Sequence, residues 1–123
     1  MADEPKRVLV FEDNPSLQAL LRAYFKRRHF DVRIAGDGVD AIAQVQDFLP
    51  ALIVMDLIMP GKDGIEACTD LRGAGITTPI VMLTSKNYAD DMRRSLAAGA
   101  NAYLLKPFDP LQLDRTIAPL IGA

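Results

Sequence analysis

Short runs of β-branched and aliphatic residues alternate with segments of helical periodicity along the whole chain. This repeated order of strand and helix is typical of a parallel sheet covered by helices on both faces. The 123 residues are enough for one domain, and we expect residues 1–123 to form it. The expected strands are Arg7–Phe11, Asp31–Ala35, Ala51–Met55, Pro79–Leu83 and Ala102–Leu105.

Capping residues predict where the first helices begin. Asn14 can cap a helix that starts at Pro15, and Asp63 with Glu66 three residues later resembles a capping box. The three expected apolar helix faces are Leu17, Leu20, Leu21, Tyr24 and Phe25; then Ala41, Ile42, Val45, Phe48 and Leu49; then Ile65, Cys68 and Leu71.

Glycine, aspartate and proline residues predict the ends of the last two helices. A fourth helix is expected from about Tyr88 to Ala98, with Gly99 as its C-terminal stop. A fifth begins after Asp109 at Pro110. Because proline cannot donate a backbone hydrogen bond, Pro119 is expected to end or kink this helix early.

Composition excludes several classes of protein. The net charge of −2 gives no electrostatic reason to expect binding to nucleic acid or to an anionic membrane. The charged start lacks the apolar stretch of a signal peptide, and no apolar run is long enough to span a bilayer. One cysteine, Cys68, cannot form an internal disulfide, and His29 cannot build a metal site with it. We therefore expect a cytoplasmic protein.

Polar residues follow four of the expected strands. In an open parallel sheet, ligands bind beyond the carboxyl ends of the strands. Three carboxylates meeting there would repel one another unless a cation joins them, and oxygen ligands with room for water favour Mg²⁺. The residues at these strand ends are Glu12, Asp13, Asp56, Thr84, Ser85 and Lys106.

This set of residues suits phosphoryl transfer to a carboxylate. An aspartate can attack phosphorus as a nucleophile, provided that the charge of the phosphoryl oxygens is neutralised. Glu12 and Asp13 can bring Mg²⁺ to one side of the phosphoryl group, and Lys106 and Thr84 can contact its other side. The sequence therefore predicts reversible phosphorylation of Asp56.

The chain resembles the receiver domain of two-component response regulators over essentially its whole length, and it resembles most a stand-alone regulator of the chemotaxis type. The similarity depends on several motifs that occur together in order. They are Val-Leu-Val-Phe-Glu-Asp-Asn at 8–14, Asp-Gly-x-x-Ala at 37–41, Met-Asp-Leu-Ile-Met-Pro-Gly-Lys-Asp-Gly at 55–64, Met-Leu-Thr-Ser at 82–85, Ala-Gly-Ala at 98–100 and Tyr-Leu-Leu-Lys-Pro-Phe at 103–108.

The resemblance implies a role for each site residue. Asp56 would accept phosphate from a sensor histidine kinase or a histidine phosphotransfer protein. Asp13, Asp56 and the backbone carbonyl of Ile58 would hold Mg²⁺, and Glu12 would act mainly through a ligand water. Lys106 would pair with the phosphoryl group.

The resemblance also implies the fold and the way in which the signal leaves the domain. The sheet would be flavodoxin-like with strand order 2-1-3-4-5, and the Lys106–Pro107 bond would be cis. Thr84 would move toward the phosphoryl oxygens and Tyr103 would turn inward behind it. The fourth helix, fifth strand and fifth helix would then bind a downstream protein target, with no direct contact to nucleic acid or membrane.

The residues leave three hypotheses of function: a stand-alone switch, a fragment of a longer protein and an enzyme. The leading hypothesis is a stand-alone phosphoacceptor switch that catalyses only its own phosphorylation and dephosphorylation. The alternative is a receiver cut from a larger hybrid kinase or transcriptional regulator. A phosphatase of the haloacid dehalogenase type is disfavoured, because it needs a second aspartate two residues after the nucleophile and Asp13 is followed by Asn14 and Pro15. A nucleotide hydrolase lacks its phosphate-binding glycine loop.

Overall fold

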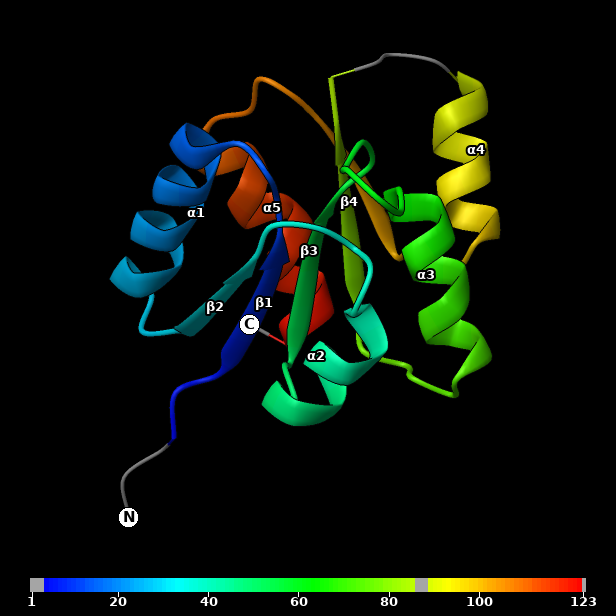
Figure 1. Ribbon diagram of the computed structural model, residues 1–123. Coiled ribbons are helices and arrows are strands. Elements are labelled where there is room, and N and C mark those ends of the chain that lie inside the picture. The colour runs from blue at the N-terminus through cyan, green and yellow to red at the C-terminus, as the bar shows by residue number, and fades with distance from the viewer. Residues whose placement is uncertain (1–3, 86–88, 123) are drawn as a thin grey trace.

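The apolar runs of the sequence form five parallel strands in one sheet of order β2-β1-β3-β4-β5 (Figure 1). The structure is a computed structural model that describes residues 4–85 and 89–122. The strand order implied by the resemblance is confirmed. The strands are β1 (Arg7–Phe11), β2 (Asp31–Ala35), β3 (Leu52–Asp56), β4 (Ile80–Thr84) and β5 (Ala102–Leu105).

Helices cover both faces of this sheet, so the central strands are buried on each side. Alternate residues of a strand point to opposite faces, and Leu9 therefore packs in one apolar cluster while its neighbour Val10 packs in the other. Figure 1 shows α1 and α5 on one face and α3 and α4 on the other. The helices are α1 (Pro15–Arg27), α2 (Ala41–Phe48), α3 (Gly64–Gly73), α4 (Ala89–Ala97) and α5 (Pro110–Ile121).

The predicted caps are confirmed. The side chain of Asn14 accepts a hydrogen bond from the backbone N–H of Leu17 at 3.0 Å. Asp63 and Glu66 form a reciprocal capping box at the start of α3. Asp109 caps α5 and forms a second capping box with Gln112, which the sequence analysis did not identify. The starts of α1, α3 and α5 are thus fixed by side-chain caps, which helps to hold the loops at the carboxyl edge of the sheet.

Two predicted core residues are exposed, and both predictions are wrong. Leu20 lies at the edge of the apolar stripe of α1, so that half of its side chain faces solvent. Leu49 follows α2 in the left-handed backbone conformation, with φ of 53°, and this turns its side chain away from the sheet. Cys68, in contrast, is fully buried, as its place in the apolar stripe of α3 predicts.

The end of α5 also differs from its prediction. The helix continues to Ile121, two residues beyond Pro119, so this proline does not end it early. Proline has no backbone N–H to donate, but the helix continues past it, and the N–H of Gly122 at the C-cap donates to the carbonyl of Ala118. The predicted start of α4 at Tyr88 lies outside the described residues. Within the described ranges, no helix combines the length and the apolar character that crossing a bilayer requires.

A polar network joins α1 to α5 on one face of the sheet. The Arg28 guanidinium stacks on the Tyr24 ring, 3.7 Å from its centroid, and donates two hydrogen bonds to the Asp114 carboxylate, at 2.9 and 3.2 Å. The Tyr24 hydroxyl donates a further hydrogen bond to Asp114. These bonds, first that from Tyr24 and then those from Arg28, hold the pKa of Asp114 below its ordinary value of 3.8.

The lowered pKa of Asp114 makes the free energy of unfolding depend on pH at acidic pH. Because the pKa of Asp114 is lowered in the folded state, its contribution to stability is present above pH 3.8 and is lost as the pH falls through the folded-state pKa. We expect Asp114→Asn to destabilise the protein at neutral pH, with the difference from wild type shrinking in acid. Urea unfolding at several pH values measures this. Asp40→Asn, at an exposed aspartate whose side chain makes no capping hydrogen bond, is the control. A difference that stays constant with pH would contradict the assignment.

Candidate functional site at the carboxyl edge of the sheet

Asp56 is the last residue of β3, and its side chain is almost fully buried, with 6% of the residue exposed. The sequence predicted that this strand ends one residue earlier. The ladder extends because Asp56 pairs with Leu83 and the next backbone N–H, that of Leu57, donates to the Leu83 carbonyl at 2.7 Å. The backbone N–H of Ile58 then donates to Asp56 Oδ1 at 3.2 Å. The carboxylate is therefore held at a fixed position by the sheet and the loop after it.

Glu12 and Asp13 follow β1, the neighbouring strand. Glu12 is fully buried and accepts a hydrogen bond on Oε2 from the backbone N–H of Asn14 at 3.1 Å, whereas Asp13 is exposed. Carboxylate oxygens of Glu12, Asp13 and Asp56 all lie within 4.8 Å of one another. The predicted meeting of three carboxylates at this edge of the sheet is present in the structure.

Gln18 also supports this group, and the sequence analysis missed it. Its side-chain amide donates to the backbone carbonyl of Glu12 at 2.6 Å and so ties the first turns of α1 to the end of β1. Gln18 lies four residues after the cap Asn14, on the same side of the helix. The spacing of four residues between Asn14 and Gln18 was the available sequence signal. A glutamine near the start of a helix is common, however, so this spacing alone does not predict the hydrogen bond to Glu12.

Lys106 reaches into the carboxylate group from the loop after β5. Its Nζ lies 2.8 Å from Asp56 Oδ2 and 3.3 Å from Glu12 Oε1. Its backbone N–H donates to the carbonyl of Thr84 at 2.6 Å, and the Lys106–Pro107 bond is cis, as the resemblance implied. Burial disfavours the ammonium, but the hydrogen bond and charge of Asp56, together with Glu12, raise the pKa of Lys106 above its ordinary value.

The balance of charge in the cleft favours a bound cation. Burial, and then the neighbouring carboxylate of Asp56, raise the pKa of Glu12 to about 7. Among the described residues, three carboxylates face one ammonium, that of Lys106, and the donors are all oxygen atoms, which suits a hard divalent ion. The cleft above them has a volume of about 470 Å³ and is lined by Glu12, Asp13, Asn14, Pro15, Asp56, Ile58, Ser85 and Lys106.

The two predicted switch residues lie on β4 and β5. Thr84 ends β4, is 1% exposed and lies at the same edge of the sheet as Asp56. Tyr103 lies on β5 opposite Met82 and is half-buried against the apolar cluster under α2, α3 and α4. Thr84 and Tyr103 therefore lie on two neighbouring strands of the sheet, β4 and β5.

The comparison with known families decides the identity of this fold and site. Residues 8–118 match the model of the response regulator receiver domain. The chain belongs to this family. The match includes all five strands, apart from Arg7 at the start of β1, and every residue of the cleft described above. A receiver domain is a signalling domain of two-component systems, and this part of the predicted function is confirmed. The phosphorylation of Asp56 stays a prediction.

The relatives of this receiver domain include full-length regulators. The DNA-binding response regulator MtrA of Mycolicibacterium smegmatis is 41% identical over 108 residues, which are 88% of this chain and 47% of that protein. The chain thus spans about half the length of the curated relatives it matches. The prediction that this receiver domain makes no direct contact with nucleic acid stays a prediction.

Solved structures include two similar receiver domains whose sites are described. The BeF₃-activated receiver domain of RstA from Klebsiella pneumoniae superimposes with a TM-score of 0.90 at 32% identity, over 96% of this chain and all of that one. The receiver domain of a sensor histidine kinase from Pseudomonas aeruginosa, solved with a magnesium ion coordinated in its active-site cleft, has a TM-score of 0.87 at 31% identity, over 97% and 99% of the two chains.

Proposed function

We propose that residues 1–123 act as one receiver domain that is phosphorylated on Asp56 and transmits its state by contact with another protein. The observation that carries this proposal is the placement of Lys106, whose ammonium lies between the buried carboxylates of Asp56 and Glu12. An ammonium held beside a buried nucleophile neutralises the charge that a phosphoryl group would bring. The phosphate donor is a sensor histidine kinase, a histidine phosphotransfer protein or a small acyl phosphate.

The transfer itself requires little covalent chemistry from the protein. One carboxylate oxygen of Asp56 forms a bond to phosphorus while the bond between phosphorus and the leaving group breaks, and the leaving group takes the electron pair. The N–H of Ile58 and the ammonium of Lys106 each hold one oxygen of this carboxylate, at 3.2 and 2.8 Å. The carboxylate of Asp56 is therefore already oriented, and after the transfer the ammonium of Lys106 can pair with the phosphoryl oxygens. Thr84 supplies a hydroxyl at the same edge.

The residues of the cleft fit Mg²⁺. Asp13, Asp56 and the backbone carbonyl of Ile58 would hold it directly, and Glu12 would act through a ligand water, because Glu12 is already engaged by Lys106 and by the N–H of Asn14. When bound, Mg²⁺ supplies neutralisation of the negative charge that gathers around the phosphoryl oxygens. The magnesium ion described for the Pseudomonas aeruginosa receiver domain supports this choice of metal.

The surface formed by α4, β5 and α5 is the proposed output face. It exposes large apolar side chains, which would be buried by a protein partner. Phosphorylation would draw Thr84 toward the cleft and let Tyr103 turn inward, and this would change the shape of the face. The exposed apolar residues on these three elements are Met92, Leu96, Leu105 and Leu111.

Dependence on Mg²⁺ tests the proposed function. With Mg²⁺ and acetyl phosphate, the intact mass of the protein should increase by one phosphoryl group, and a chelator should prevent the increase. Asp13→Asn should raise the Mg²⁺ concentration that is needed for half-maximal phosphorylation by about tenfold or more, because one anionic ligand is lost. Asp40→Asn is the matched control and should behave as wild type. Phosphorylation that persists in the chelator, or an unchanged Mg²⁺ requirement in Asp13→Asn, would reject this metal site.

A further inference from the structure

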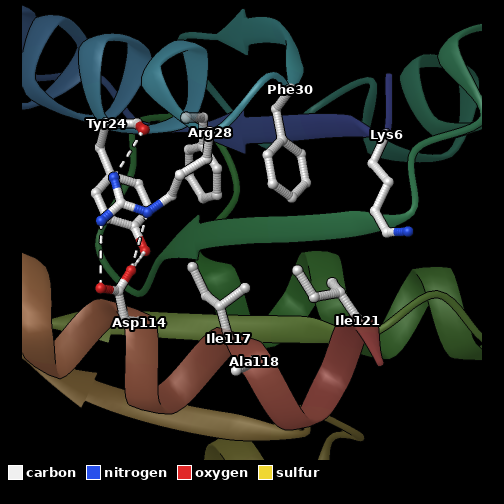
Figure 2. A pocket seen from close by; sticks show the side chains of 9 residues that line it. Lys6, Tyr24, Arg28, Phe30, Asp114, Ile117, Ala118 and Ile121 are labelled. Carbon is white, nitrogen blue, oxygen red and sulfur yellow. Dashed lines mark hydrogen bonds and ion pairs between the residues drawn. The ribbon is translucent and has the colours of Figure 1, made fainter. Parts of the chain in front are cut away.

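A second cavity lies at the opposite end of the molecule, between α1 and α5. It opens beside the amino end of β1 and has a volume of about 360 Å³. Figure 2 shows Phe30 and Lys6 on the upper wall, and Ile117 and Ile121 of α5 on the lower wall. This cavity shares no lining residue with the carboxylate cleft, which lies where the strands finish.

The walls of this cavity are mainly apolar. Phe25 and Phe30 pack edge to face, with ring centroids 5.1 Å apart, and both belong to the apolar cluster that includes Ile117 and Ile121. Ala118 lies between these two isoleucines and leaves space where a larger side chain would fill it. The volume falls within the range of sites for small organic ligands, which are typically apolar with a few placed polar groups.

The cavity is lined by two cations, Arg28 and Lys6, which differ in whether they can pair with a ligand. Arg28, at one end, is committed to Asp114 by two hydrogen bonds and to the carbonyl of Tyr24 by a third, so its charge is already balanced. Lys6, at the other end, makes no ion pair within the described part of the chain, and Figure 2 shows its ammonium away from that network. The cavity therefore has an apolar body with one available positive charge at its mouth.

A second depression adjoins this mouth. It is lined by Lys6, Arg28 and His29 together with the carboxylate of Glu4. Because Arg28 is already paired with Asp114, Lys6 is the cation at this mouth that an anionic ligand can engage. An ammonium beside an apolar cavity attracts anions and repels organic cations.

We propose that this cavity binds a small amphipathic carboxylate, with its apolar part between Phe30 and α5 and its anionic group at Lys6. The bound molecule would contact both α1 and α5 and would stabilise their packing by binding the folded state alone. Because α5 also contributes to the proposed output face, a ligand in the cavity would affect the packing of that face from the end of the molecule opposite Asp56. This inference stands on the cavity and does not depend on phosphorylation.

A pair of probes that differ only in charge tests the inference. Titration of the unphosphorylated protein with 2-naphthoate should give saturable amide NMR shifts at Phe30, Ile117 and Ile121, and 2-naphthalenemethanol should bind about five- to tenfold more weakly. Lys6→Gln should remove this preference for the anion. Lys26→Gln, which makes the same charge change outside the cavity lining, should keep it. Equal affinity for the two probes, or a preference that survives Lys6→Gln, would overturn the anionic specificity.

A second variant tests the cavity itself. Ala118→Phe should fill the space between α1 and α5 and abolish the saturable shifts, while the amide spectrum away from the cavity stays that of the folded protein. Ala43→Phe, at an exposed position on α2, should bind both probes as wild type does. Binding that persists in a folded Ala118→Phe protein, or the absence of any saturable shift in wild type, would reject the cavity as a ligand site.

Discussion

Asp56→Asn is expected to abolish phosphorylation by acetyl phosphate, so that the intact mass of this variant does not change under conditions in which wild type gains one phosphoryl group. An amide is a far weaker nucleophile than a carboxylate, and it cannot carry the negative charge that the transfer requires. Asparagine has nearly the same size as aspartate, and it can keep the hydrogen bond from the N–H of Ile58. The loss of phosphorylation should therefore come without a loss of the fold.

The controls for this variant separate chemistry from structure. Asp40→Asn makes the same substitution at an exposed aspartate and should accept phosphate as wild type does. Lys106→Met should give a severe reduction in the rate, because it removes the ammonium that lies 2.8 Å from Asp56 Oδ2. If Asp56→Asn is folded and still gains the full phosphoryl mass, then another residue is the acceptor and the proposed function is wrong.

Gly64→Ala is expected to lower the free energy of unfolding by about 1–3 kcal/mol, the usual cost of overpacking a closed interior. Gly64 is the first residue of α3, directly behind the phosphoacceptor. A Cβ atom there would lie 2.5 Å from the backbone oxygen of Asp56 and 3.0 Å from the Cα of Leu57, which are parts of the backbone that cannot move independently. The loop after β3 must therefore shift, and we expect slower phosphorylation of Asp56 as well.

Gly73→Ala is the matched control for this substitution. Gly73 is the last residue of the same helix, and apart from its chain neighbours and the backbone of its own helix no atom lies within 4 Å of the position that its Cβ would take. Alanine has the higher helix propensity, so the variant should be as stable as wild type or more stable by up to about 1 kcal/mol. Urea unfolding of both variants measures the difference. Equal stability of Gly64→Ala and Gly73→Ala would show that the loop after β3 tolerates the added methyl group.

The sequence was sufficient to predict the architecture because each element carries its own local signal. Three strands have the predicted bounds, while β3 and β4 are displaced by one residue. The displacement has a cause in the sheet, because Asp56 still pairs with Leu83 of β4 and Thr84 still pairs with Leu105 of β5. The apolar run of the sequence stops at Met55, before Asp56, because the side chain changes there. The backbone hydrogen bonds of the strand do not depend on the side chain and continue through Asp56.

The differences at Leu20, Leu49 and Pro119 each have a local cause. Helical periodicity predicts an apolar face, but the width of the buried part depends on how the helix lies on the sheet. The apolar stripe of α1 is wider than the surface that this helix buries against the sheet, and Leu20 lies at the margin of the buried surface. Leu49 lies where the chain has already left the helix. Pro119 falls in the last turn, where few hydrogen bonds remain to be lost.

For the site, the sequence determined which chemical groups are present and at which end of the sheet they gather. Parallel strands bring their carboxyl ends to one edge, so Glu12, Asp13, Asp56, Thr84 and Lys106 had to be neighbours once five parallel strands were predicted. Only the tertiary structure decided which of them touch. The contact of Lys106 with Asp56 and Glu12 spans 50 and 94 residues of chain, and the cavity between α1 and α5 depends on how two helices pack on one face. Side-chain contacts and empty space arise from packing between distant segments, and local sequence patterns carry no record of either.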